Sequence, residues 1–200
     1  MKAEGMVKQE HIIEAAIKRF SHFGVGKTTL AEIADDLAIS KPSLFYYFKD
    51  KNGLVTEVAK KIISEFLAGY EIKLETALTA EEGLQNLVEV KRKYFKKYFL
   101  LAVQGESVEY SKVPQEITEV YQQARNKSIL LVSKLFQKGI ETGELKPMDT
   151  VKTASIILDI FSAFEHCMKA RRSIPDVNEF DNLFDREKEV VSMIVNGLKK

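Results

Sequence analysis

Apolar residues recur at helical spacing along almost the whole chain, and this pattern restricts the fold more than any other feature. The clearest example runs from Ile12 to Phe20, where apolar side chains occur every three or four residues. No segment shows the strict alternation of apolar and polar residues that a half-buried strand requires. Only four prolines and ten glycines interrupt 200 residues. We therefore predict an all-α protein of about nine helices.

Capping residues divide the pattern into separate helices. Gly24 stands where a glycine often follows a helix, and Thr29 with Glu32 forms a capping box at the start of the next. Ser40 and Asp50 are predicted N-caps of two further helices. A second capping box, at Thr79 and Glu82, begins a helix that reaches Ala102 before Gly105. A long helix then runs from Pro114 to Gly143. The last two helices are predicted over 149–172 and 176–199, and Asp176 caps the final one.

Composition and charge narrow the class of protein. With 45% hydrophobic and 30% charged residues, the chain has enough apolar mass for a core. Thirty basic and 29 acidic residues nearly cancel, so any attraction to nucleic acid must be local. A single cysteine fits a reducing compartment. We see no signal peptide and no run of apolar residues long enough to span a bilayer, and we expect a cytoplasmic protein without a membrane partner.

The organisation is uneven along the chain. Three short helices precede residue 48, and longer ones follow. We predict a small N-terminal domain over residues 1–50 and a larger C-terminal domain over residues 51–200. The helix that begins near Asp50 is expected to join them without a flexible linker and to transmit movement between them.

Residues Leu30 to Tyr47 fit a helix, a tight turn and a second helix, the arrangement in which the second helix enters the major groove of DNA. The segments 11–20, 28–34 and 39–48, together with Gly24, Lys51 and Leu54, resemble the N-terminal domain of the TetR family of transcriptional regulators. The resemblance covers about residues 8 to 55. It implies a homodimer that binds double-stranded DNA. Residues 1–50 would be the DNA-binding domain, and residues 51–200 the effector-binding and dimerisation domain with a cavity for a small molecule.

The way in which a helix-turn-helix docks on DNA assigns roles to individual side chains. Lys41, Pro42, Ser43 and Tyr46 are expected to reach base edges, where lysine can donate to guanine and proline or tyrosine can touch thymine methyls. The resemblance adds Leu30, which could make only an apolar contact. The residues placed for phosphates are Thr29, Ser40, Tyr47 and Lys51. Residues 39–51 hold three lysines against Asp50, so the module is locally basic.

Two positions depart from the family pattern. Ala38 stands in the turn where the family usually has glycine, and a left-handed alanine there would cost about 1 kcal/mol. Phe45 stands where the family usually has tyrosine, so a phosphate hydrogen bond from that side chain is lost.

The larger C-terminal region is rich in aromatic residues, most of which we expect in the core. The residues predicted to border the effector cavity are Phe66, Tyr94, Tyr98, Tyr121 and Phe161. The last two helices carry apolar residues over more than one face, which predicts a two-fold four-helix interface. The residues predicted for that dimer interface are Ile157, Phe164, Phe184, Val191, Ile194 and Leu198.

Three other patterns favour structural explanations. Gly24 to Thr28 resembles the end of a phosphate-binding loop, but it follows a helix and lacks the first glycine. His166 and Cys167 are adjacent on a helix and so point apart, which rules out a nucleophile–base pair between them.

Lysines at 91, 93, 96 and 97 flank aromatic residues. These lysines fit a solvated helix face, a surface for a membrane or an acidic partner, or the mouth of a ligand pocket. We find no catalytic set, no metal site and no cofactor motif.

The chain has three candidate functions. A ligand-responsive regulator, a repressor that binds a pseudopalindromic operator as a homodimer, explains the residues best. The alternative is a regulator of the same fold that has no small effector and is constitutive or gated by a protein partner. An all-α enzyme is disfavoured because the chain shows no catalytic constellation.

Overall fold

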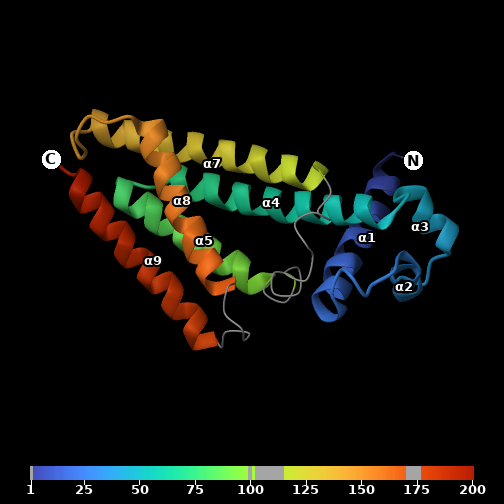
Figure 1. The fold of residues 1–200 in the computed structure, drawn as a ribbon. Coiled ribbons are helices and arrows are strands. Elements are labelled where there is room, and N and C mark those ends of the chain that lie inside the picture. The colour runs from blue at the N-terminus through green and yellow to red at the C-terminus, as the bar shows by residue number, and fades with distance from the viewer. Residues whose placement is uncertain (1, 99–100, 102–114, 170–176) are drawn as a thin grey trace. The chain divides into compact units, whose positions relative to one another are not determined.

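The structure is a computed structural model that describes residues 2–98, 101, 115–169 and 177–200, without the side chains of residues 2–4, 165–169, 177 and 178. Eight α-helices make up this part of the chain (Figure 1). They are α1 (Lys2–Phe23), α2 (Leu30–Asp36), α3 (Lys41–Tyr47), α4 (Lys51–Glu75), α5 (Ala80–Lys97), α7 (Gln115–Glu141), α8 (Thr150–Lys169) and α9 (Val177–Leu198). The described residues contain no strand, only an isolated antiparallel bridge between Leu145 and Lys199. The all-α prediction is confirmed.

The chain forms two compact units, and the boundary between them falls within α4, after Ser64. The first unit contains residues 1–64 and 98–121, and the second contains residues 65–97 and 122–200. A DNA-binding domain limited to residues 1–50 stays a prediction. Within the described residues, no helix is both long and apolar enough to cross a membrane.

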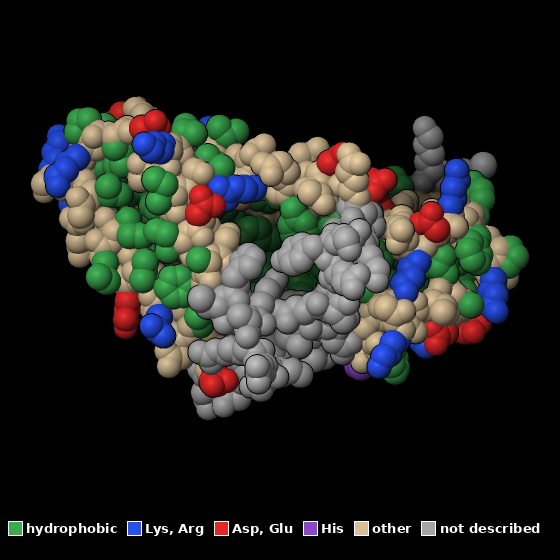
Figure 2. Space-filling model, viewed as in Figure 1, with side chains coloured by type: hydrophobic (Ala, Val, Ile, Leu, Met, Phe, Trp, Pro, Cys, Tyr) green, Lys and Arg blue, Asp and Glu red, His purple; other side chains and the backbone are tan. Residues whose placement is uncertain are grey.

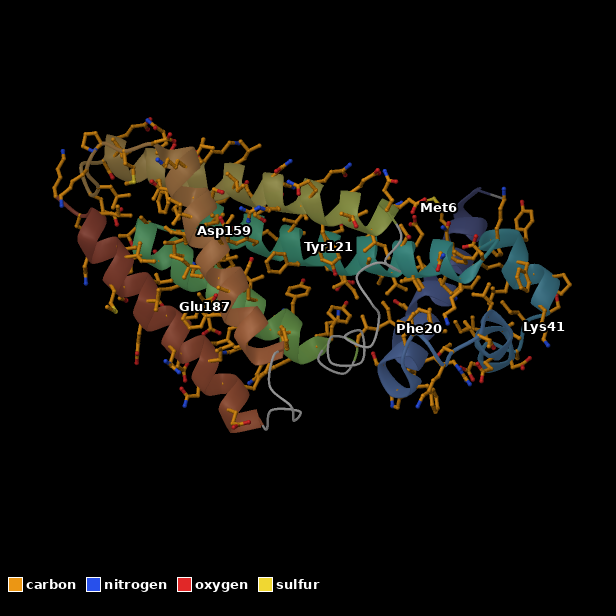
Figure 3. All side chains as sticks on the ribbon, in the orientation of Figure 1. Met6, Phe20, Lys41, Tyr121, Asp159 and Glu187 are labelled. Carbon is orange, nitrogen blue, oxygen red and sulfur yellow. The ribbon has the colours of Figure 1, made fainter. Side chains whose placement is uncertain are left out.

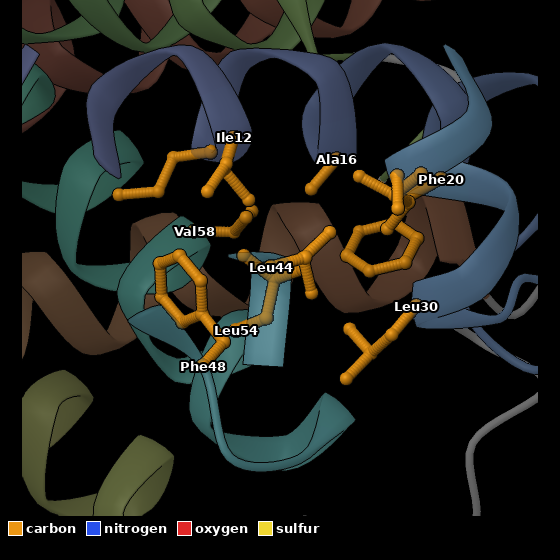
Figure 4. Close-up of a cluster of buried hydrophobic side chains, with 11 residues drawn as sticks. Ile12, Ala16, Phe20, Leu30, Leu44, Phe48, Leu54 and Val58 are labelled. Atoms are coloured by element: carbon orange, nitrogen blue, oxygen red, sulfur yellow. The ribbon is translucent and has the colours of Figure 1, made fainter. Parts of the chain in front are cut away.

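The first unit is built around one hydrophobic cluster, shown in Figure 4. Ile12, Ala16 and Phe20 contribute to it from α1 at the three- and four-residue spacing seen in the sequence. The other buried members are Ile13, Leu30, Ile33, Ala34, Leu44, Phe48, Leu54 and Val58. Because α1, α2, α3 and the start of α4 share this cluster, they pack as a single body.

The caps predicted around this cluster are confirmed. The Thr29 hydroxyl accepts from the Glu32 backbone N–H at 3.3 Å, and Glu32 accepts from the Thr29 N–H at 2.7 Å. The Ser43 N–H donates to the Ser40 hydroxyl at 3.3 Å. A backbone N–H likewise reaches Asp50 at the start of α4.

The later boundaries agree less closely. The Glu82 N–H donates to the Thr79 hydroxyl as predicted, but the Glu82 carboxylate accepts from the N–H of Leu78 and not from that of Thr79. Helix α5 ends at Lys97, before the predicted Ala102. Gly143 has φ 80° after the end of α7. The predicted stop at Gly105 and the predicted caps at Pro114 and Asp176 lie outside the described residues.

The second unit places α5 along α9, and a close approach of α5 to α7 fixes its packing. A Cβ atom on Gly83 would lie 2.4 Å from a methyl carbon of Leu135, so any larger residue at this crossing would force the Leu135 side chain to move. The largest fully buried side chains of this unit are Tyr70, Leu84, Leu87, Phe136, Leu145, Phe161 and Phe184.

Candidate DNA-binding interface

A tight turn joins α2 to α3. The Ala38 N–H donates to the Asp35 carbonyl and the Ile39 N–H to the Ala34 carbonyl, both at 3.0 Å. Ala38 has φ +52°, the left-handed conformation that disfavours residues with a Cβ. The turn is therefore closed by backbone hydrogen bonds, and alanine occupies the position where glycine would be unstrained.

Arg19 holds α1 against α2. Its guanidinium lies 2.8 Å from the Asp36 carboxylate and 3.0 Å from that of Glu32. The backbone N–H of Thr29, then its hydroxyl, and the charge of Arg19 together lower the pKa of Glu32. Glu32 thus caps α2 and also joins it to α1. Sequence reasoning identified the cap but missed the ion pair, because its partners are far apart along the chain.

The buried side chain of Leu44 sets the orientation of α3. Leu44 is 0% exposed, and the residues opposite it point away from the core. Lys41, Pro42 and Ser43 are exposed, as is Tyr46 at 84%. Figure 3 shows Lys41 at the outer edge of this module. The residues predicted to reach base edges from α3 therefore lie together on one accessible surface.

Of the four residues predicted to contact phosphates, two are exposed and two are half-buried. Thr29 and Ser40 are exposed, although both hydroxyls also cap helices. Tyr47 is half-buried, with its ring 5.2 Å from that of Tyr46 in a T-shaped contact. Lys51 is half-buried, and its Nζ donates to the Gly26 carbonyl at 3.2 Å.

Leu30 and Phe45 differ from what their sequence positions suggested. Leu30 is only 8% exposed and packs in the hydrophobic cluster, so its side chain is not available to a base and we do not keep it as a contact. At Phe45 the sequence predicted only the loss of a hydrogen bond, yet this residue is 46% exposed beside the residues predicted to reach base edges. Figure 2 shows hydrophobic side chains at the surface over α3, together with Lys and Arg side chains.

The residues predicted to border an effector cavity belong to different units. Phe66, Tyr94 and Phe161 are in the second unit, and Tyr98 and Tyr121 are in the first. The Phe66 and Tyr94 rings meet edge to face at 5.9 Å, and the Tyr94 hydroxyl donates to the Glu65 carbonyl at 2.8 Å. Phe161 and Tyr98 are buried, whereas Tyr121 is 60% exposed.

Tyr70 is a buried residue of the second unit with a polar hydroxyl group. Its side chain is 0% exposed and stacks on Phe66 with 6.2 Å between ring centroids. Its hydroxyl has no hydrogen-bond partner within the described part of the chain, and burial raises its pKa well above the usual value. A buried hydroxyl without a partner destabilises the fold, which makes Tyr70 a candidate for ligand binding.

The lysine-rich face of α5 turns largely toward its own chain. Lys91 lies 2.5 Å from the carboxylate of Glu187, which is only 1% exposed, and 4.8 Å from the centroid of the Phe161 ring. Figure 3 shows Glu187 on α9. Lys96 and Lys97 form ion pairs within the second unit, and Lys93 is exposed. The interpretation of these lysines as a solvated helix face is therefore wrong for Lys91, because Glu187 on α9 is its buried partner.

The residues predicted for the dimer interface are partly covered by their own chain. Three of them, Ile157, Phe184 and Val191, are at most 2% exposed in the single chain. The other three, Phe164, Ile194 and Leu198, are half-buried. Among the described side chains of α8 and α9, the large apolar residues that are exposed are Val151, Ile156 and Met193.

The patterns set aside in the sequence analysis gain no support from the described residues. The Gly24–Thr28 loop lies between α1 and α2, and the Thr28 hydroxyl donates back to the Gly24 carbonyl. No group of three metal-ligating side chains occurs in the part of the chain that the structure describes. The side chains of His166 and Cys167 lie outside it.

Comparison with known proteins agrees with this architecture. Residues 12–58 match the model described as bacterial regulatory proteins, tetR family. The HTH-type transcriptional regulator YhgD of Bacillus subtilis is 24% identical over 78% of this chain and 81% of its own length. The HTH-type transcriptional repressor KstR2 of Mycolicibacterium smegmatis is 25% identical over 70% of this chain and 68% of its own. A transcriptional regulator from Cytophaga hutchinsonii has a similar crystal structure, with a TM-score of 0.83 and 26% identity, and the match covers 96% of this chain and 99% of that one.

Proposed function

This chain belongs to the TetR family of transcriptional regulators, and from that premise we propose that it is a homodimeric, ligand-responsive repressor that acts in the cytoplasm on a pseudopalindromic operator. The observation that carries the DNA-binding proposal is the surface of α3. Lys41, Pro42, Ser43 and Tyr46 are exposed together, on a helix whose orientation is fixed by the buried Leu44. The printed name of KstR2, a repressor, supports repression as the direction of control.

Phosphate contacts in this proposal come from residues at or next to the ends of α2 and α3 and from the start of α4. Thr29, Ser40, Tyr47 and Lys51 would fix the position of the module on the duplex, and the α3 residues would read sequence. Reading two half-sites requires two copies of the module, which a two-fold dimer provides.

The proposed dimer uses α8 and α9. Because Ile157, Phe184 and Val191 are already covered by their own chain, the partner would contact the residues beside them. Exposed Val151, Ile156 and Met193, with half-buried Phe164, Ile194 and Leu198, supply apolar surface for this contact. A soluble monomer rarely leaves such residues uncovered as a continuous patch.

The proposed effector site lies in the second unit, where Tyr70 offers a buried hydroxyl next to the Phe66 ring. An apolar effector carrying one polar group would satisfy that hydroxyl and remain among aromatic side chains, the usual character of a ligand pocket. Helix α4 contributes residues to both units, so a shift of α4 on ligand binding would change the spacing of the two reading heads.

The DNA-binding proposal is tested by selection from a duplex library with a randomised central region. The wild-type protein should enrich a two-fold symmetric sequence. Tyr46→Ala should fold, since the ring is 84% exposed, and should lose discrimination of about 1–3 kcal/mol at the bases it contacts. The absence of any enriched sequence would refute DNA reading by this chain.

The effector proposal is tested by thermal unfolding in the presence of a metabolite library. A compound that binds only the folded protein raises the melting temperature. Tyr70→Phe removes the unpartnered hydroxyl and keeps the ring, so the variant should be at least as stable as wild type and respond more weakly to the same compound. A regulator without a small effector, the alternative function, would give no shift with any compound.

A further inference from the structure

A groove lies along one face of α1, beside the end of α2. It is lined by side chains of α1 and by Asp36 and Leu37, and all of its lining residues belong to the first unit, whereas Tyr70 belongs to the second. Its volume is about 660 Å³, within the range of roughly 300–1,000 Å³ that small-molecule sites occupy. The groove is therefore large enough for a small ligand.

The short side chain of Ala15 leaves room for this groove. Lys18 and Arg19 follow Ala15 by three and four residues, so their longer side chains stand beside it on the helix surface. Ala15 and Leu37 are half-buried and give the groove an apolar stretch between charged groups. A ligand that fits here needs an apolar part as well as charge.

The aromatic ring of Phe23 stands at one end of the groove. Phe23 is 55% exposed, and the guanidinium of Arg19 lies over its ring at 5.0 Å from the centroid. Arg19 is itself held by the carboxylate of Asp36 at 2.8 Å. The ring is thus restrained on one side and open on the other, where an aromatic group of a ligand can pack.

Two opposite charges line the groove one helical turn apart. Glu14 precedes Lys18 by four residues, the order that favours an ion pair within a helix. Lys18 is nevertheless exposed, and its ammonium has no partner among the residues that the structure describes. Glu14 lies 4.0 Å from Lys61, which also pairs with Glu10. That distance is too long for a hydrogen bond, so the carboxylate and the ammonium both stay available.

A zwitterion satisfies both charges at once. In an α-amino acid the ammonium and the carboxylate share one carbon, so the first can face Glu14 while the second faces Lys18. A ligand with a single charge would leave one of these groups without a counterion. We propose that this groove binds an α-amino acid with an aromatic side chain, which lies over Ala15 and Leu37 and reaches Phe23. This site goes beyond the proposed function and does not depend on it.

The test is a titration of the whole protein with L-phenylalanine, followed by NMR. The ring C–H signals of His11 and His22, which both line the groove, should shift and reach saturation. Three analogues each remove one contact: phenethylamine lacks the carboxylate, hydrocinnamate lacks the ammonium, and L-alanine lacks the ring. Each should raise the Kd about three- to fivefold, the size of one exposed ion pair or one aromatic contact.

Variants assign each part of the ligand to a residue. Lys18→Met should weaken the binding of L-phenylalanine about three- to fivefold but not that of phenethylamine, which has no carboxylate to lose. Glu14→Gln should weaken L-phenylalanine but not hydrocinnamate, and Phe23→Ala should weaken L-phenylalanine but not L-alanine. The matched controls are Lys49→Met and Phe45→Ala, which change an exposed lysine and an exposed phenylalanine of the same unit outside the groove.

The outcomes separate this site from the proposed effector site. Tyr70→Phe should leave the binding of L-phenylalanine unchanged, and circular dichroism verifies that each variant is folded. The absence of a saturable shift in either histidine signal overturns the site. Equal affinity for L-phenylalanine and for both single-charge analogues overturns recognition of a zwitterion. Equal weakening by Lys18→Met and Lys49→Met shows a general attraction of charge and overturns the role of Lys18.

Discussion

The Nζ of Lys51, at the start of α4, donates a hydrogen bond to the carbonyl oxygen of Gly26 at a distance of 3.2 Å. Gly26 lies in the loop that precedes α2, so this contact joins that loop to the helix that follows the helix-turn-helix. Lys51 thus has a structural contact in addition to its proposed role at a phosphate, and the two roles have different consequences when the side chain is shortened.

Lys51→Ala should weaken DNA binding to a similar extent for every sequence. If the ammonium also contacts a phosphate, the slope of log affinity against log salt should fall by about one. Loss of the hydrogen bond alone should lower stability by about 0.5–1.5 kcal/mol without changing the slope. Titrations at several salt concentrations measure the slope. The control Lys60→Ala, on the same helix and paired with Glu57, should leave it unchanged.

Ala38→Gly should stabilise the protein by up to about 1 kcal/mol. The left-handed φ of +52° strains an alanine and suits a glycine, although glycine also increases the entropy of the unfolded chain. Denaturant unfolding measures the difference. Ala59→Gly, inside α4, should have the opposite sign because glycine disfavours a helix interior. Equal destabilisation by both changes would show that the turn is not strained.

Gly83→Ala should destabilise the second unit by about 1–3 kcal/mol, because the new methyl would meet Leu135 at 2.4 Å. Gly197→Ala provides the control. No atom lies within 4 Å of its would-be Cβ, and alanine favours the helix, so this change should be neutral or stabilising. Leu135→Ala should partly restore the stability of Gly83→Ala. If Gly83→Ala unfolds like wild type, the two helices do not approach as closely as described.

Lys91→Met should destabilise the fold by about 3–5 kcal/mol, since it leaves the carboxylate of Glu187 buried without its cation. Adding Glu187→Leu removes that charge and should recover most of the loss. Chemical unfolding of both single variants and the double variant gives the coupling between the two residues. Additive effects would indicate that the pair contributes no interaction of its own.

Local sequence signals predicted the DNA-binding module well. The caps at Thr29, Ser40 and Asp50 need only neighbouring backbone, and the exposed position of Tyr46 follows from helical spacing once Leu44 is assigned to the core. Burial of Leu30 was harder to predict. The residue begins α2, and whether its side chain faces DNA or the core depends on the angle at which α1 crosses it.

What the sequence alone determined is the set of helices, because periodicity, caps and glycines act over a few residues. The tertiary structure decided which of two apolar faces each helix buries and where its polar residues find partners. Ile157, Phe184 and Val191 lie in the core of their own chain, and Lys91 turns inward because Glu187 on α9 meets it. The Lys91–Glu187 pair joins residues about a hundred positions apart. The burial of Ile157, Phe184 and Val191 depends on how whole helices pack. A local sequence pattern carries no information about distant partners or about helix packing.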